Sequence, residues 1–553
     1  MKNITKIFLL VGVFVFSACE LDYLESPNDV TLASADPAYL LNRIQTDFAS
    51  FYAGTSSRGA RTTRIRHQAS DTYEISYQAV SQDGTWNNAY SNLLNDIKNL
   101  KVLAEDRGFK RHLGMAKTME AYIWMTLVDQ FGDIPFSEAL NPDEFNPVAD
   151  NGSAVYTAAF DLLVSAKADF QATSIGTPND YFYANNATKW IRLVNTMMLK
   201  YHLNRKLVDA AGSTAAINAL NTENNYLGVG DDFVFKYGIS VADPDSRHPD
   251  YSGQFPNGGG DYQSTYYMWH LTEAKKTGGA TPGDASPSPD PRAHYYFYRQ
   301  TGVNTTSASE RECVGAFPPS HYPVDMVWCF PGTRGYWGRD HLDPDGIPPD
   351  GLRRTLYGIY PAGGPFDNNN PASISSSLVG NRGAGIQPIM LAAFADFMRA
   401  EAALTLGTSG DAKALLVSAI TKHINYVRTW SLTTNEAAKI TAFIPSGDHD
   451  IQRANYLSYV SNEYDAANAA GKLRVIAREY WIALYGNGVE AYNLYRRTGQ
   501  PDGMQPGEIA SFGDFPRSFF YPAVYVVRNR NADQKDDHNV QVFWDTNPAG
   551  FID

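Results

Sequence analysis

The sequence predicts a mostly α-helical protein in which paired helices form a scaffold and a long, loop-rich insertion interrupts them. Apolar residues recur at helical spacing within residues 36–235 and 386–511, which is typical of amphipathic helices. Between these two parts, residues 236–385 are rich in Gly, Pro, Asp and Tyr and show almost no helical period. A connector of that length is unusual in a compact protein unless it serves a function.

The chain opens with a segment that is typical of protein export. Two lysines precede the apolar run 7–16, and Ser17 and Ala18 then precede Cys19. The run is too short to span a bilayer as a helix, so residues 1–18 are predicted to be a signal peptide that is removed. A cysteine at this place looks like a bacterial lipobox, whose sulfur receives a diacylglycerol and tethers the protein to a membrane. The alternative is an ordinary signal peptide with an incidental cysteine.

The helices are predicted in order from their apolar stripes. Residues 19–35 are polar, acidic and turn-rich, which predicts a flexible tether between the lipid and the body. Helical periodicity then covers about 90–103, 113–127, 154–170, 187–211, 390–406, 411–428, 473–484 and 489–497. Consecutive helices joined by loops favour antiparallel pairs, and their small residues resemble tetratricopeptide packing without a clean repeat. Residues 512–553 are predicted to be loop-like.

Composition excludes several classes of function. The formal net charge of -13 and the lack of clustered Lys and Arg argue against nucleic-acid binding. No sequence fingerprint of a serine hydrolase, zinc protease, P-loop or dinucleotide site is present. Aromatic residues between Gly, Asn, Asp and Pro describe long structured loops, which are common in extracellular proteins that handle carbohydrates.

Six short segments occur in a fixed order behind the lipobox. They are residues 124–139, 189–195, 290–292 (Asp-Pro-Arg), 397–403, 478–486 and 517–522. Together they resemble the SusD/RagB family, the surface lipoproteins of Bacteroidetes nutrient-uptake systems, over essentially the whole mature chain. The stretch 345–354 is similar to one that recurs in the second SusD-like group.

The resemblance implies a fold and a function. The fold would be one SusD-like domain over residues 36–553, with four tetratricopeptide-like helix pairs. The protein would be lipid-anchored at Cys19 on the outer membrane and exposed at the cell surface. There it would be a non-catalytic lid on a SusC-like TonB-dependent transporter, to which it would deliver glycans. Alternatives are a peptide-binding lid, a surface glycoside hydrolase with two carboxylates across a cleft, and a helical scaffold that binds only proteins.

Candidate ligand-binding residues are the aromatic residues outside the helix stripes, because sugars bind to aromatic faces and to hydrogen-bonding side chains. Trp124, Trp190 and Trp481 lie at core spacing in helices and are expected to pack inside the protein. The candidates are Tyr73, Trp86, Tyr267, Trp269, Trp328, Tyr336 and Trp337. Any one of them could instead anchor its loop, but we expect at least one cluster to form a binding platform.

Cysteines and carboxylates supply the remaining candidates. Cys313 and Cys329 predict either a disulfide or two buried thiols, and neither has the spacing of a metal site. An aspartate cluster, Asp340, Asp343, Asp345 and Asp350, could bind Ca²⁺ but lacks the glycine and the closing glutamate of an EF-hand, so solvated turns are the favoured interpretation. No other cofactor is expected. Glu401 and Glu479 are interpreted as capped or paired structural carboxylates.

Overall fold

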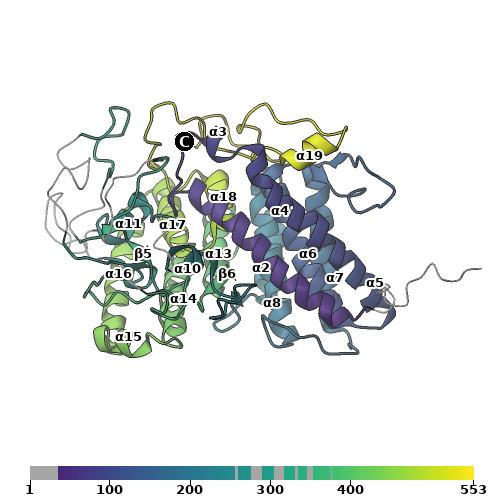
Figure 1. Ribbon diagram of the computed structural model, residues 1–553, viewed down its shortest axis with the longest axis horizontal. Helices are drawn as coiled ribbons and strands as arrows, with labels where there is room; N and C mark the ends of the chain where they lie inside the picture. The colour runs from purple at the N-terminus through teal and green to yellow at the C-terminus, as the bar shows by residue number, and fades with distance from the viewer. Residues whose placement is uncertain are drawn as a thin grey trace, which may run out of the picture.

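The computed structural model describes residues 35–255, 260–275, 289–303, 317–329, 334–344, 353–374 and 376–552. The predicted signal peptide, the lipid attachment at Cys19, nearly all of the tether, Cys313, Asp345 and Asp350 lie outside these residues. Helices dominate the described part and stand side by side in two groups, with loops above and below them (Figure 1). In the part of the chain that the structure describes, every helix is too short or too polar to cross a membrane.

The first group of helices comes from the N-terminal part of the chain. It contains α2 (Pro37–Thr62), α5 (Asn95–Asp106), α6 (Lys110–Phe131), α7 (Gly152–Gln171), α8 (Ala187–Asn204) and α9 (Ala210–Glu223). Consecutive members pack against one another from α5 to α9, and α2 packs across α5 and α6. The short helices α3 (Tyr73–Ser76) and α4 (Asp83–Asn87) lead into α5 through a π-helical segment at 88–94. Side chains of Asp36, Asn151 and Asn186 cap α2, α7 and α8.

The second group follows the insertion. It contains α13 (Ala392–Leu406), α14 (Ala412–Ser431), α15 (Ala437–Phe443), α16 (Ser446–Ala466), α17 (Ala469–Ala483) and α18 (Gly488–Thr498). The two groups share a core, because α18 packs along α2 and α13 packs against α8. The two helices approach so closely that a Cβ atom on Gly59 of α2 would meet the backbone of Gly488, and a Cβ atom on Gly488 of α18 would meet the α2 backbone at Ser56 and Ala60.

Three small antiparallel sheets tie the loops to the helices. β1 (Ile134–Pro135) pairs with β2 (Ala149–Asp150), and β4 (Phe297–Tyr298) pairs with β5 (Leu356–Tyr357). β3 (Phe233–Lys236) pairs with β6 (Ile386–Met390), and these two strands flank the loop-rich insertion. The insertion itself carries α10 (Pro249–Gln254), α11 (Thr265–Thr272) and α12 (Ala293–Tyr296).

The mostly helical fold is confirmed, and the differences from the predicted elements have local causes. The helix predicted over 187–211 ends at Asn204, and α9 begins after Asp209, whose side chain accepts a hydrogen bond from the Gly212 amide and starts a new helix. α2 was not predicted, because small and polar residues fill its second half. α16 was not predicted either, since only four of its residues, His449, Tyr456, Val460 and Tyr464, are buried. The C-terminal segment contains one short helix, α19 (Ala523–Arg528), which follows Pro522.

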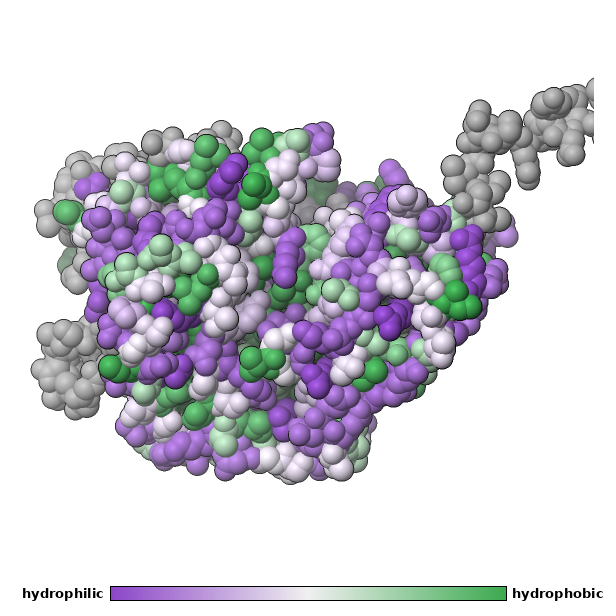
Figure 2. Space-filling model, turned by 90° about the horizontal axis from the view of Figure 1, so that it is seen from below, coloured by the Kyte–Doolittle hydropathy of each residue, from purple (hydrophilic) through white to green (hydrophobic). Residues whose placement is uncertain are grey.

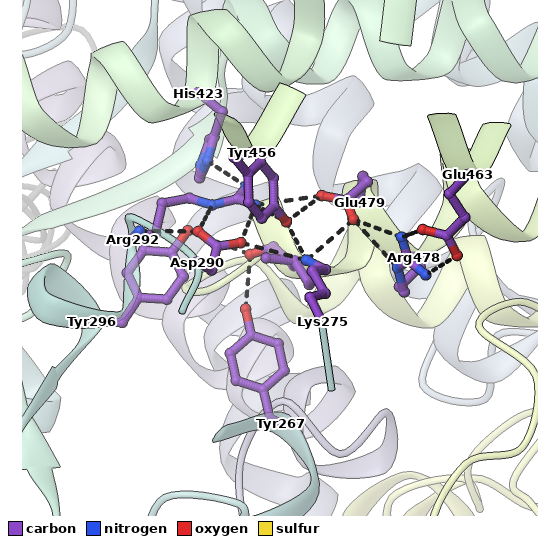
Figure 3. A network of polar contacts seen from close by, with 11 residues as sticks. Tyr267, Lys275, Asp290, Arg292, Tyr296, His423, Tyr456, Glu463, Arg478 and Glu479 are labelled. Atoms are coloured by element: carbon purple, nitrogen blue, oxygen red, sulfur yellow. Dashed lines mark hydrogen bonds and ion pairs between the residues drawn. The ribbon is translucent and has the colours of Figure 1, made fainter. Parts of the chain in front are cut away.

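A buried network of charges fastens the insertion to the second helix group (Figure 3). Asp290 and Arg292 of the insertion form a bidentate pair, with 2.8 Å from Nε to Oδ1 and 2.6 Å from Nη2 to Oδ2. Lys275 lies 3.2 Å from Glu479 of α17, which also accepts a hydrogen bond from the Tyr456 hydroxyl of α16 at 2.7 Å. The interpretation of Glu479 as a paired structural carboxylate is therefore confirmed. Glu401 is likewise paired, with Arg497 at 2.7 Å and Lys206 at 2.9 Å.

Candidate functional site

The structure separates the seven candidate aromatic residues into a buried group and an accessible pair. Five are packed in the core with at most 6 % of their surface exposed, namely Tyr73, Trp86, Tyr267, Tyr336 and Trp337. Their contacts explain the burial: the Tyr267 hydroxyl, for example, donates to the Ile482 carbonyl at 2.8 Å, and its ring stacks on Tyr485. Only Trp269 and Trp328 among the seven are partly exposed. Trp124, Trp190 and Trp481 are buried, as their helical spacing predicted.

Trp328 lies in a loop of the insertion that is hydrogen-bonded to residues 506–508, which follow α18. Its indole Nε1–H donates to the carboxylate of Glu508 at 3.3 Å. The Tyr322 hydroxyl donates to the Pro506 carbonyl at 3.2 Å, and the His321 imidazole contacts the Gly507 carbonyl at 2.9 Å. These bonds hold a half-buried tryptophan ring beside a carboxylate and an imidazole on one surface.

A second layer of hydrogen bonds fixes this loop from beneath. Gln505 donates to the Val327 carbonyl at 2.9 Å and to the carboxylate of Asp340 at 2.5 Å. Asp340 also accepts a hydrogen bond from the Cys329 amide at 2.7 Å. Because these buried groups satisfy one another, the Trp328 loop has a defined position on the scaffold.

Burial raises the pKa of both carboxylates at this site. Asp340 is buried, and desolvation raises its pKa to about 7 despite the hydrogen bonds from Gln505 and Cys329. Desolvation also raises the pKa of Glu508, and the charge of Asp343 adds to the effect. Glu508 is only partly buried and has one oxygen engaged by Trp328, so it remains able to accept hydrogen bonds from a ligand.

Buried contacts connect the Trp328 loop with α3, which borders an open hollow. The Tyr73 hydroxyl of α3 bonds the His341 imidazole at 2.9 Å, and the Tyr73 amide donates to the Phe512 carbonyl at 3.0 Å. On α3 and the C-terminal loop lies a hollow of about 550 Å³, lined by residues that include Thr72, Gln78, Phe520 and Gln534. In Figure 1 this region is the top of the molecule, where α3 and the C-terminal loops meet. We define Trp328, Glu508 and this hollow as the upper site.

The candidate calcium and disulfide residues are only partly described, and Asp340 is buried, so its interpretation as a solvated turn aspartate is wrong. Both oxygens of Asp340 already accept hydrogen bonds from the protein, and no group of three metal-binding side chains occurs in the described ranges. Cys329 is buried and disulfide-bonded. Since Cys313 lies outside the described residues, its pairing with Cys329 stays a prediction.

Several residues of the upper site were not predicted. Glu508, Gln505, His321 and Tyr322 are single polar residues in loops, and nothing in their spacing marks them. The signal that was available is Trp328 itself, an aromatic residue between Pro and Gly. A partly exposed ring beside the carboxylate of Glu508 is suited to binding a hydroxyl-rich ligand with apolar ring surfaces.

Comparison with known families agrees with the mostly helical architecture. A family model described as starch-binding and associating with the outer membrane matches residues 27–245. A model described as SusD and RagB outer membrane lipoprotein matches residues 358–539. The chain belongs to the SusD/RagB family, as its sequence predicted.

Solved structures of this family share the fold at low sequence identity. A chitin-binding protein has a TM-score of 0.65 at 18% identity and covers 93% of this chain and 100% of its own. A SusD homologue from Bacteroides fragilis has a TM-score of 0.62 at 18% identity, covering 92% and 99%. A chitin-binding SusD homologue from Flavobacterium johnsoniae has a TM-score of 0.61 at 17% identity, covering 92% and 99%. Comparison with curated protein sequences finds no match.

Proposed function

We propose that this protein is a non-catalytic lipoprotein of the outer-membrane surface that binds a glycan at the upper site. It would be anchored through Cys19 and would pass the glycan to a SusC-like TonB-dependent transporter. The observation that carries the proposal is the partly exposed Trp328 ring, whose indole N–H donates a hydrogen bond to Glu508. The chitin-binding relatives make oligomers of N-acetylglucosamine the first ligands to test.

Two variants test the upper site directly. Trp328→Ala removes the exposed ring, and we expect it to weaken glycan binding by about 30-fold, since a central tryptophan contributes about 2 kcal/mol to binding. Glu508→Gln keeps the shape but weakens the hydrogen bond to the indole, so a smaller loss of roughly three- to tenfold follows. Isothermal titration calorimetry against chitin and starch oligosaccharides measures both.

Two further substitutions are the matched controls. Trp269→Ala removes the other partly exposed candidate, which lies on α11 and packs against His270, and should leave the affinity for the same oligosaccharides unchanged. Trp337→Ala leaves a cavity in the core, so it should lower the melting temperature and not weaken glycan binding selectively. If Trp328→Ala and Glu508→Gln both bind a glycan with the affinity of the wild-type protein, the upper site is not where that glycan binds.

A further inference from the structure

A pocket of about 530 Å³ lies at the other end of the helices from the upper site. The segment that leads into α8, the strand β3, the start of α13 and the last turns of α14 form its walls. α15, which follows α14 directly, is at the bottom of Figure 1, whereas α3 is at the top. Figure 2 views the molecule from below and shows a hollow near the middle of this face, with apolar side chains among polar ones.

The wall formed by α14 carries an aromatic row beside a polar row. Residues four apart on a helix share one face and are separated by about 6 Å along the axis. The aromatic row consists of Tyr426 and Trp430, with Lys422 one turn before them, and the polar row consists of Thr421, Asn425 and Thr429. Buried Tyr360 supports both rings from behind, with ring centroids 6.4 Å from Tyr426 and 5.8 Å from Trp430 in nearly perpendicular contacts. The rings are therefore fixed before any ligand arrives.

Polar groups on this wall retain hydrogen-bonding capacity. The Asn425 side-chain oxygen accepts from Arg453 at 2.6 Å, so its amide N–H groups remain available as donors. The Tyr426 hydroxyl makes no hydrogen bond with the part of the chain that the structure describes. Burial, and secondarily the charge of Asp232, raise the pKa of Tyr426, so the hydroxyl stays protonated and can donate.

The charges around the pocket favour a neutral ligand. Lys422 is paired with Asp396 at 2.6 Å, and Lys189 donates to the Gly230 carbonyl at 2.5 Å. The third lysine of the lining, Lys236, is exposed to solvent, where an ion pair with an anionic ligand would contribute little to binding. The carboxylate of Asp232 in the wall repels anions and accepts hydrogen bonds. Aromatic faces, amide donors and a carboxylate acceptor together suit a neutral sugar ring.

We propose that this pocket, lined by Tyr426, Trp430, Asn425 and Asp232, is a second glycan-binding site. The inference rests on the proposed function, because it assigns the same class of ligand to a separate place on the molecule. Two sites at opposite ends would raise the avidity for long polysaccharides above the affinity for short oligosaccharides.

Hydrogen–deuterium exchange of the purified protein tests the second site independently of the first. The probes are neutral hexasaccharides built from N-acetylglucosamine or from glucose. We expect a hexasaccharide to slow amide exchange in residues 421–433, and this protection should persist in Trp328→Ala. It should disappear in Trp430→Ala, with roughly a tenfold loss of affinity at this site, equal to about 1.4 kcal/mol.

Two additional variants distinguish loss of the second site from misfolding. Thr429→Arg places a long charged side chain at an exposed position of the wall without removing a buried ring, and it should also abolish protection of residues 421–433. Lys413→Ala, near the opposite end of α14, should behave as wild type. Protection confined to the upper site, in residues 72–79, 317–329, 503–508 or 520–535, would overturn the second site and leave the proposed function intact. Absence of protection in all of these segments with every hexasaccharide would overturn both.

Discussion

Replacing Arg292 by methionine would leave an unbalanced negative charge in the core network of Figure 3. The guanidinium is buried, pairs twice with Asp290, and lies 3.5 Å from Glu479. After the substitution, Asp290 keeps Lys275, at 3.6 Å, as its charged partner within the described residues. In the wild-type protein, the charges of the network drawn in Figure 3 balance to zero. Its cations are Lys275, Arg292 and Arg478, and its carboxylates are Asp290, Glu463 and Glu479.

The expected cost follows from the burial of the pair. Removing one partner of a buried ion pair costs about 3–5 kcal/mol, because the remaining charge stays desolvated. The entropy of unfolding is about 2.1 cal/mol/K per residue, or about 1 kcal/mol/K for a folded body of roughly 500 residues. Arg292→Met should therefore lower the melting temperature by about 3–5 °C.

Differential scanning calorimetry at pH 7 measures this shift against two matched variants. Arg474→Met removes an exposed pair with Asp502, whose stabilisation is at most about 1 kcal/mol, so the melting temperature should move by about 1 °C or less. The double variant Asp290→Asn with Arg292→Met restores neutrality and should regain part of the loss. If Arg292→Met costs no more than Arg474→Met, or if the double variant is less stable than the single one, the charge-balance reasoning is wrong.

Three other predictions concern the anchor and the core. Cys19→Ser should release the protein from membranes on fractionation, and incorporation of labelled palmitate into that variant would contradict the lipid anchor. Glu401→Gln removes the partner of buried Arg497 and should destabilise the protein at pH 7. Burial raises the pKa of Glu401, but the charges of Arg497 and Lys206 outweigh it and lower the pKa to about 2. The carboxylate therefore stabilises the fold above its unfolded pKa near 4.5. The difference in the free energy of unfolding between wild type and Glu401→Gln should thus shrink as the pH falls from 4.5 towards 2. Denaturant titrations that give equal differences at pH 7 and pH 3 would refute this prediction. Gly488→Ala should strongly lower the melting temperature by forcing α18 away from α2, whereas Gly447→Ala, with open space at its Cβ position, should not; equal shifts would contradict the close contact.

The elements with a strong apolar stripe were predictable, and those held mainly by tertiary contacts were not. The stripe from Leu113 to Leu127 marks α6, and Gly132 ends it with a positive φ of 79°, which glycine adopts readily. α16 exposes most of its surface and contributes few apolar residues, so its periodicity is weak. The paired roles of Glu401 and Glu479 were inferred from their apolar neighbours, but their partners come from distant segments that no local pattern reveals.

The candidate site was less predictable than the fold for a similar reason. Aromatic residues in loops and aromatic residues in the core look alike in sequence, and Tyr267 and Trp337 are buried because α17 and the insertion close over them. Trp328 differs only in that its neighbours leave one part of the ring uncovered. Tyr426 and Trp430 were not predicted as site residues, since the helix was expected to end at Arg428 and the pocket needs β3 and α8 for its other walls.

The measurement that tests the central claim most directly is native gel electrophoresis of the purified protein in gels that contain single polysaccharides, with reducing ends assayed in parallel. The account predicts retardation by at least one neutral polysaccharide, weaker retardation of Trp328→Ala, and no new reducing ends. New reducing ends would show a glycoside hydrolase instead of a binding protein. Unretarded migration with every polysaccharide, together with binding of peptides, would contradict the glycan-binding function.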